Sequence, residues 1–146
     1  MSARDRGELS DQALLAGFLE RTLPCDLFHH REHLRVAWLL LRRHGDFGEA
    51  GVAFRRSLKA YATACGGAGK YHETLTWAWL TLVQERMVDA SGVALEADRD
   101  SRAFLKRCPA LLEAREALAP HYELDELLLS ERARRVLVLP VGSGTG

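Results

Sequence analysis

The chain has 146 residues, enough for one domain and too few for two ordinary ones. Hydrophobic residues make up 47% and charged residues 27% of the chain, a balance typical of a globular protein rather than a disordered one. The 20 basic and 20 acidic side chains cancel, which argues against binding to nucleic acid or to a membrane surface through bulk charge. We therefore expect neither as a partner.

The cysteines and the start of the chain indicate a compartment. Cys25, Cys65 and Cys108 are widely spaced and form no C-x-x-C pair. An odd number with this spacing makes a disulfide framework or a zinc ribbon improbable, and a reducing cytosol fits better. The segment from Met1 to Leu9 is charged and has no apolar signal-peptide core, and arginines interrupt the apolar run Val36 to Leu41. These features predict a cytoplasmic protein with no membrane span.

Apolar spacing predicts helices along almost the whole chain. A first helix follows a cap at Ser10 and ends before Pro24. A second is expected at about residues 29–44, with Gly45 as its C-terminal cap, and a third at about residues 47–65. After the breaker Gly66-Gly67-Ala68-Gly69 comes a fourth helix, at about residues 70–87.

The later part of the chain predicts shorter elements. A surface loop is expected at residues 89–98, and short helices at about residues 101–107, 110–118 and 125–135. The tail from residue 136 to 141 is either a packed strap or a frayed end. The predicted fold is all-α, a single domain over residues 1–146 with four main helices and shorter C-terminal helices. Residues 1–9 and 140–146 are expected to be flexible.

Histidines lie on the predicted buried faces of two helices. On a helical wheel, His30 and His33 fall on the apolar stripe of the second helix, opposite Arg31 and Arg35, which we expect in water. In the fourth helix, His72 is central to the inward stripe, and Glu73 lies at its edge. If the two helices are neighbours, these imidazoles converge.

Three converging imidazoles suggest a metal site. Each ring buried without a partner costs about 1–3 kcal/mol, a large part of a domain's stability. His30 and His33 are spaced i, i+3 and can chelate one ion, His72 adds a third nitrogen, and Glu73 can supply an oxygen or orient a ring. The predicted cofactor is one divalent ion (Zn, Fe or Mn) in a three-ligand site with an open position.

The same histidines allow interpretations without a metal. Core histidines are more often hydrogen-bonded to hydroxyls, carbonyls or carboxylates, and no H-E-x-x-H or E-x-x-H signature is present. Neutral imidazoles also suit acid/base chemistry near pH 7, with Tyr71, Thr76 and His121 as further binding residues. Haem ligation is a third possibility, weakened because the chain has no C-x-x-C-H.

Two further features carry weaker signals. Gly66-Gly67-Ala68-Gly69-Lys70 resembles a phosphate loop only superficially, because it lacks G-x-x-x-x-G-K-[ST] and follows a helix. We interpret it as a turn that could gate a site beside His72. Trp77 falls on the polar side of its helix, where it would cover a later segment or face a partner.

Several segments together resemble one family. Phe28-His29-His30-Arg31-Glu32-His33-Leu34 resembles an F-x-H-x-x-H-L segment, and Lys70-Tyr71-His72-Glu73-Thr74-Leu75-Thr76 resembles K-Y-H-E-T-[IL]-T. The segment from Phe104 to Leu112, His121-Tyr122 and Ser130-Glu131-Arg132-Ala133-Arg134 resemble the later part of the same small uncharacterised bacterial proteins. The resemblance covers most of the chain from Phe28 to Arg134. It implies no reaction, but it implies that His30, His33, His72, Glu73 and His121 belong together.

These observations favour a small helical enzyme with a buried polar site. His72, Glu73, His30 and His33 would be its catalytic residues, acting on a small molecule with a metal or as acid/base groups. Metal-assisted hydrolysis, oxygen chemistry and proton transfer all stay open as reactions. The alternative is a non-catalytic ligand- or partner-binding module with a structural histidine network, for which a homodimer anchored by Trp77 would be suitable.

Overall fold

The computed structural model describes residues 8–140, and these residues form an all-α fold, as predicted. Within this range the chain contains eight α-helices, three short 3-10 helices and one isolated β-bridge, Val88 to Ala94. In chain order the elements are α2 (Asp11–Leu19), η1 (Cys25–Leu27), α3 (His30–His44), α4 (Phe47–Ala64), η2 (Ala68–Lys70), α5 (Glu73–Glu85), α6 (Ser101–Arg107), η3 (Pro109–Leu112), α7 (Ala114–Leu118), α8 (Leu124–Leu129) and α9 (Glu131–Arg135).

Local capping sets the ends of the main helices. The Ser10 hydroxyl accepts the Ala13 N–H at the start of α2, and the Asp46 carboxylate accepts the Glu49 N–H at the start of α4. Helix α3 ends at Gly45, whose φ of 71° is the left-handed conformation that glycine adopts without strain. The predicted bounds of α3 and α4 are confirmed to within one residue, and α2 begins after Ser10 as predicted but already ends at Leu19.

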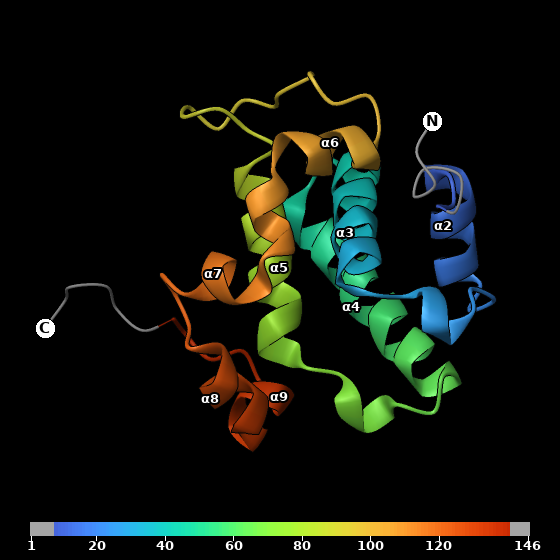
Figure 1. Ribbon diagram of the computed structural model, residues 1–146, viewed down its shortest axis with the longest axis vertical. Coiled ribbons are helices and arrows are strands. Elements are labelled where there is room, and N and C mark those ends of the chain that lie inside the picture. Colours follow the sequence, from blue (N-terminus) through green and yellow to red (C-terminus); the bar gives the residue numbers. More distant parts are fainter. Residues whose placement is uncertain (1–7, 141–146) are drawn as a thin grey trace, which may run out of the picture.

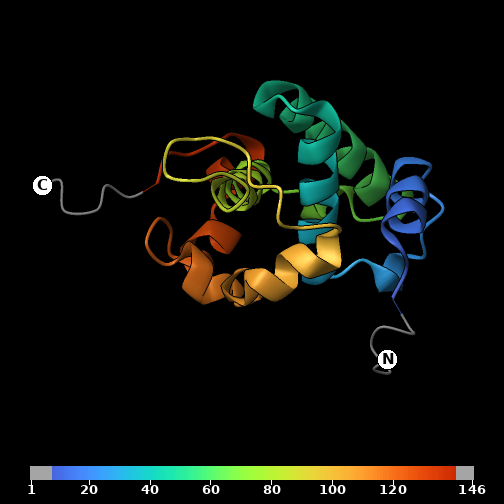
Figure 2. The same cartoon turned by 90° about the horizontal axis from the view of Figure 1, so that it is seen from above.

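Helix α3 lies at the centre of the molecule. It packs against α2, α4, α5 and α6, and its buried apolar residues belong to one continuous hydrophobic core. The first helix, α2, and the short helices α7, α8 and α9 lie on opposite sides of α3 and α5 (Figures 1 and 2). Close approach between α4 and α5 depends on Gly51, because a Cβ at this position would overlap with the ring of Trp77.

Arg35 corrects the predicted polar face of α3. The wheel placed this side chain in water, but it is only 1% exposed. Its Nε donates to Ser101 Oγ at 2.7 Å, and its Nη2 donates to the Leu9 carbonyl at 2.7 Å and to the Asp11 carboxylate at 3.1 Å. The helical wheel failed here because α2 and α6 cover this side of α3 and supply the partners that a buried guanidinium requires.

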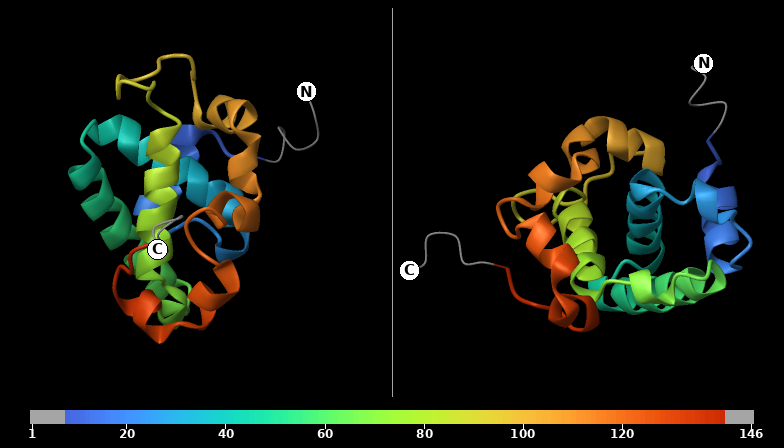
Figure 3. Two further views of the ribbon diagram at one scale, coloured as in Figure 1. Left: turned by 90° about the vertical axis from the view of Figure 1, so that its left-hand side faces the viewer. Right: turned by 60° about the horizontal axis from the view of Figure 1, so that its bottom comes forward.

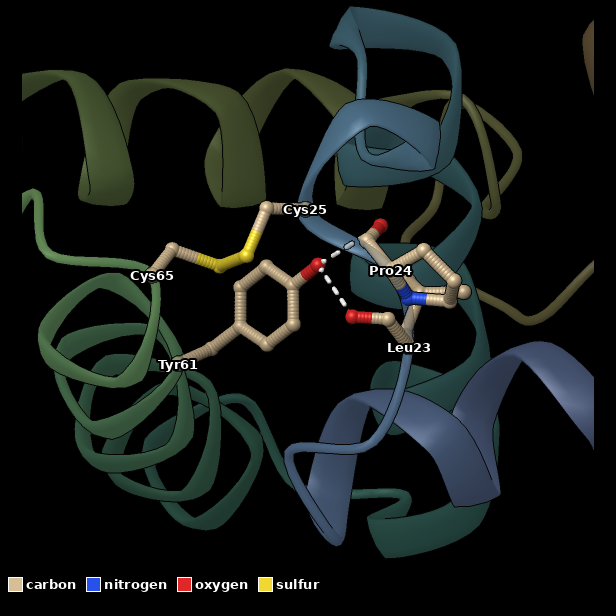
Figure 4. Close-up of a disulfide and its surroundings, with 5 residues drawn as sticks. All are labelled: Leu23, Pro24, Cys25, Tyr61 and Cys65. Carbon is tan, nitrogen blue, oxygen red and sulfur yellow. Dashed lines mark hydrogen bonds between the residues drawn. A yellow bond between two sulfur atoms is a disulfide. The ribbon is translucent and has the colours of Figure 1, made fainter.

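A disulfide joins Cys25 to Cys65, so the prediction that disulfide bonds were improbable is wrong. The two residues are 40 apart in sequence, and the bond links η1 to the residue that ends α4. Tyr61 reinforces the same junction, because its hydroxyl donates to the carbonyls of Leu23 and Pro24 at 2.9 and 3.2 Å (Figure 4). Cys108 is free and buried.

The C-terminal segment, which we define as residues 109–140, packs along the side of α3 and α5. The two helices predicted at residues 110–118 and 125–135 are each divided, into η3 with α7 and into α8 with α9. Helix α9 packs against α5 near the start of that helix (Figure 3). The tail after α9 is a packed strap, because Thr74 Oγ1 donates to the Val136 carbonyl and accepts the Val138 N–H.

The expected flexible ends fall largely on residues 1–7 and 141–146, which lie outside the described residues. Two residues of the predicted flexible N-terminus are instead bonded, since Glu8 pairs with Arg31 and the Leu9 carbonyl accepts from Arg35. No helix in residues 8–140 combines the length and the apolar character that a membrane span needs.

Candidate functional site

A pocket of about 230 Å³ lies between α4 and the beginning of α5, next to His33 of α3. We call it the inner pocket. Its wall contains two of the predicted site histidines together with aromatic, aliphatic and hydroxyl side chains. The lining residues are His33, Leu58, Ala62, Lys70, Tyr71, His72, Leu75, Thr76 and Trp79.

His33 is the residue of the inner pocket that has an unused polar atom. Its Nε2 is sealed from water and has no hydrogen-bond partner. The ring lies between two phenylalanines, with centroids 5.2 Å from Phe54 and 5.9 Å from Phe28. Burial, assisted by the nearby His30, lowers the pKa of His33 to about 3, so the ring is neutral at physiological pH. An unpaired nitrogen of this kind costs about 1–3 kcal/mol, which a ligand could offset.

His72 is buried beside the same pocket, but both of its nitrogens are occupied. Its Nδ1 accepts the Leu75 N–H at 3.1 Å and so caps α5, and its Nε2 donates to the Leu127 carbonyl at 2.9 Å. Because the fourth helix begins after this cap, it starts at Glu73 rather than at the predicted Lys70. The two bonds require the neutral Nε2–H tautomer, which leaves this ring no nitrogen for a metal or a substrate.

His30 faces a different set of neighbours from His33. Its Nε2 donates to the Leu111 carbonyl at 2.9 Å, and its ring lies 4.5 Å from that of Trp79. Burial lowers the pKa of His30, and the bond to Leu111 opposes this shift in part. Trp79 therefore contacts His30 and also lines the inner pocket. His30 itself does not line the pocket.

Glu73 is fully engaged as a carboxylate. It accepts Arg55 Nε at 2.9 Å, the Tyr71 hydroxyl at 2.7 Å and the Trp77 indole N–H at 3.0 Å. Burial alone would raise its pKa, but these three donors outweigh burial and hold the pKa of Glu73 below its usual value. Its oxygens are therefore committed to Tyr71, Trp77 and Arg55, so the predicted role in taking a proton has no free oxygen to act through.

The predicted metal-ligand set is not formed. Nowhere in residues 8–140 do three His, Cys, Asp or Glu side chains gather closely enough to hold a metal ion. The physical reason lies in the partners of two rings, because backbone carbonyls of the C-terminal segment occupy the Nε2 atoms of His30 and His72. The wheel placed these imidazoles inward correctly, but it carried no information about which carbonyls would meet them.

The predicted binding residues are divided between two places. Tyr71 and Thr76 line the inner pocket, and Thr76 Oγ1 donates to the His72 carbonyl at 2.8 Å. His121 lies elsewhere, on an apolar groove of about 330 Å³ beside the strap, together with Trp77 and Tyr122. Trp77, the suggested partner anchor, is half-buried and donates its indole N–H to Glu73.

Sequence reasoning missed one feature near the inner pocket. Lys59 of α4 and Arg134 of α9 meet the glycine-rich loop, where Arg134 Nη1 donates to the Gly69 carbonyl at 3.1 Å. Lys59 directly follows Leu58 of the pocket wall, so a helical wheel of α4 could have indicated that a cation lies beside the pocket. The contribution of α9 had no signal, because pairing between distant helices is not encoded in either helix alone.

Comparisons of the chain with protein-family models, with curated proteins and with solved structures give no match. The function is therefore argued from the geometry of the inner pocket.

Proposed function

We propose that this protein is a binding module for a small ring-containing molecule, which occupies the inner pocket without undergoing a reaction. The observation that carries the proposal is the unpartnered Nε2 of His33 in the ring that lines the pocket. Unsatisfied buried polar atoms are uncommon in folded proteins, and each one calls for an explanation, of which a bound molecule is one. Because Nε2 is sealed in the unliganded protein, a ligand hydroxyl or N–H group satisfies it only after the His33 ring turns toward the pocket.

The pocket wall indicates the kind of ligand. Trp79, Tyr71 and Leu75 offer aromatic and aliphatic faces, and ligand pockets are lined mostly by such residues with a few polar groups. Ligand pockets commonly measure about 300–1,000 Å³. The volume of about 230 Å³ suits a molecule smaller than a typical drug, of the size of a single substituted ring.

Binding is favoured over acid/base catalysis because of the states of the other predicted catalytic residues. His72 has both ring nitrogens in hydrogen bonds, Glu73 accepts from three side chains, and His30 donates to a backbone carbonyl and lies outside the pocket lining. A general base must reach the proton that it abstracts, with its own lone pair free. The proposal therefore corresponds to the ligand-binding alternative among the predicted functions.

Nuclear magnetic resonance titration with phenol and toluene tests the proposal. Phenol has a hydroxyl that can pair with His33, and toluene has a ring of similar size without one. We expect phenol to shift resonances of the inner pocket and to bind at least five-fold more tightly than toluene. In His33→Phe, which removes the nitrogen but keeps a ring, this preference should disappear.

Two variants of α4 locate the binding. Ala62→Phe fills the inner pocket and should abolish phenol binding, whereas Ala64→Phe places the same ring on the exposed side of the helix and should leave it unchanged. Phenol binding that survives Ala62→Phe, or equal affinity for phenol and toluene in the unmodified protein, would contradict the proposal. Thermal unfolding of each variant confirms that it is folded.

A further inference from the structure

A second cavity of about 590 Å³ lies next to the inner pocket. We call it the basic recess. Its wall contains three cationic side chains and one carboxylate, together with part of the glycine-rich loop. The lining residues are Lys59, Thr63, Ala68, Gly69, Tyr71, Glu131, Arg134 and Arg135.

The two cavities share a wall. Tyr71 lines both of them, and three pairs of chain neighbours contribute one residue to each: Leu58 and Lys59, Ala62 and Thr63, and Gly69 and Lys70. In α4 the spacing explains this division, because Leu58 and Ala62 form one i, i+4 stripe, and Lys59 and Thr63 form the adjacent stripe. Tyr71 therefore borders both cavities.

Two of the three cations of the basic recess, Arg134 and Lys59, have neighbours that position them, whereas Arg135 is 79% exposed. Arg134 Nη1 donates to the Gly69 carbonyl at 3.1 Å, and its Nη2 donates to the Leu128 carbonyl at 3.0 Å. The ammonium of Lys59 lies over the ring of Tyr71, 5.2 Å from its centroid. Arg134, whose two Nη atoms are both bonded, therefore loses less freedom than an unrestrained side chain when it binds an anion.

One acidic side chain only partly balances these cations. Glu131 lies 3.6 Å from both Arg134 and Arg135, and it is 70% exposed, so water screens its attraction for them. Lys70 adds another cation on the inner-pocket side of Tyr71. The region around Tyr71 therefore has an excess of positive charge in a protein whose formal net charge is zero.

We propose that the basic recess binds the anionic group of the ligand whose ring occupies the inner pocket. The ligand class is then a small ring compound that carries a phosphate or a carboxylate, because lysine and arginine donors pair with both groups. This inference rests on the proposed function for the position of the ring. The position of the anion rests on Lys59, Arg134 and Arg135 alone.

Titration calorimetry at low salt tests the inference with phenyl phosphate, benzoate, phenol and inorganic phosphate. We expect phenyl phosphate or benzoate to bind at least ten-fold more tightly than phenol. The double variant Lys59→Ala/Arg135→Ala should remove that advantage and change the Kd of phenol less than two-fold. Arg56→Ala, which removes an exposed cation of α4 outside both cavities, should change each Kd less than two-fold.

The outcomes separate the inference from the proposed function. Equal affinity for phenol and for both anionic compounds would overturn the inference and leave the proposed function supported by phenol. Tight binding of phenyl phosphate that depends on Lys59 and Arg135 but is unchanged in His33→Phe would support the anion site and overturn the ring position. If phenyl phosphate loses more affinity than benzoate in the double variant, the recess prefers phosphate, and the reverse result indicates carboxylate. Titration with inorganic phosphate shows whether the anion binds without a ring.

Discussion

The long helices and the C-terminal segment are stabilised in different ways. Helices α3, α4 and α5 have 15, 18 and 13 residues and bury apolar stripes in a common core. Helices α7, α8 and α9 have only 5, 6 and 5 residues, a length that is marginal for an isolated helix. Polar side chains from the long helices attach the C-terminal segment through its backbone.

The histidines illustrate this difference. His30 and His72 belong to the long-helix region, yet their Nε2 atoms bind carbonyls of Leu111 and Leu127 in the C-terminal segment. His33 lies on the same helix as His30 but contacts rings of the long-helix region and has no partner for its Nε2. An inward-pointing histidine can therefore either attach the C-terminal segment or line a pocket. Its role depends on whether the neighbouring segment supplies a partner for its nitrogen.

The largest expected effect concerns the Cys25–Cys65 disulfide of the long-helix region. The 40-residue separation corresponds to a stabilisation of about 4 kcal/mol if the bond acts by restricting the unfolded chain. Guanidinium unfolding with and without dithiothreitol should show this loss, and the double variant Cys25→Ala/Cys65→Ala should be equally weakened and insensitive to the reductant. An unchanged unfolding midpoint after verified reduction would contradict this account.

The second prediction concerns the attachment of the C-terminal segment by His72. His72→Ala removes the α5 cap and the bond to Leu127, and we expect a loss of about 2–3 kcal/mol of unfolding free energy. His72→Asn keeps a good N-cap but does not reach Leu127, so its loss should be about 1 kcal/mol.

Urea unfolding measures both His72 losses, and hydrogen exchange locates them. In His72→Asn, faster exchange should be confined to α8 and its neighbours in the C-terminal segment. Equal losses in the two variants would show that the bond to Leu127 is the whole contribution of His72, and the cap would then add nothing.

The third prediction concerns the pH dependence caused by His33. Its pKa falls from an ordinary value of 6.5 to about 3 on folding, so the unfolded chain binds a proton in this interval and the folded protein does not. Stability is therefore lost as the pH falls below 6.5, by about 2 kcal/mol at pH 5. In His33→Phe this contribution should disappear. A variant with the same acid dependence as the unmodified protein would show that other groups cause it.

The smallest expected effect concerns the strap at the end of the C-terminal segment. Thr74 is fully buried and bonds to the backbone of both Val136 and Val138. Thr74→Val should cost about 1 kcal/mol locally, because it leaves these backbone groups unpaired. Hydrogen exchange at Val138 should accelerate while the amides of α3 keep their protection. Tyr122→Phe, which removes the bond to the Val138 carbonyl, is the matched variant from the other side of the strap.

Much of the secondary structure was predictable because its causes are local. Ser10 and Gly45 set helix ends through bonds and backbone angles within a few residues, and the apolar stripe of α3 follows from its own period. The helices of the C-terminal segment were predicted less well, since they are short and are divided where they turn to follow α3 and α5. Their ends depend on contacts with other elements rather than on caps alone.

The candidate site was predictable in part. The inward direction of His33 and His72 follows from helical period, and both line the inner pocket together with Tyr71 and Thr76. The metal set was not formed, and His121 lies in a separate groove. Which atom each ring would meet could not be predicted, because the partners of His30 and His72 lie 81 and 55 residues away in the chain.

The sequence by itself determined where the main helices lie, which faces are apolar and that histidines point inward, because periodicity and capping act over a few residues. Only the tertiary structure decided that Arg35 is buried, that Cys25 pairs with Cys65 and that the Nε2 of His33 is buried without a hydrogen-bond partner. These outcomes depend on which distant segments come into contact. A hydrogen bond or a disulfide requires its two partners within a few ångströms, and local sequence does not specify that proximity.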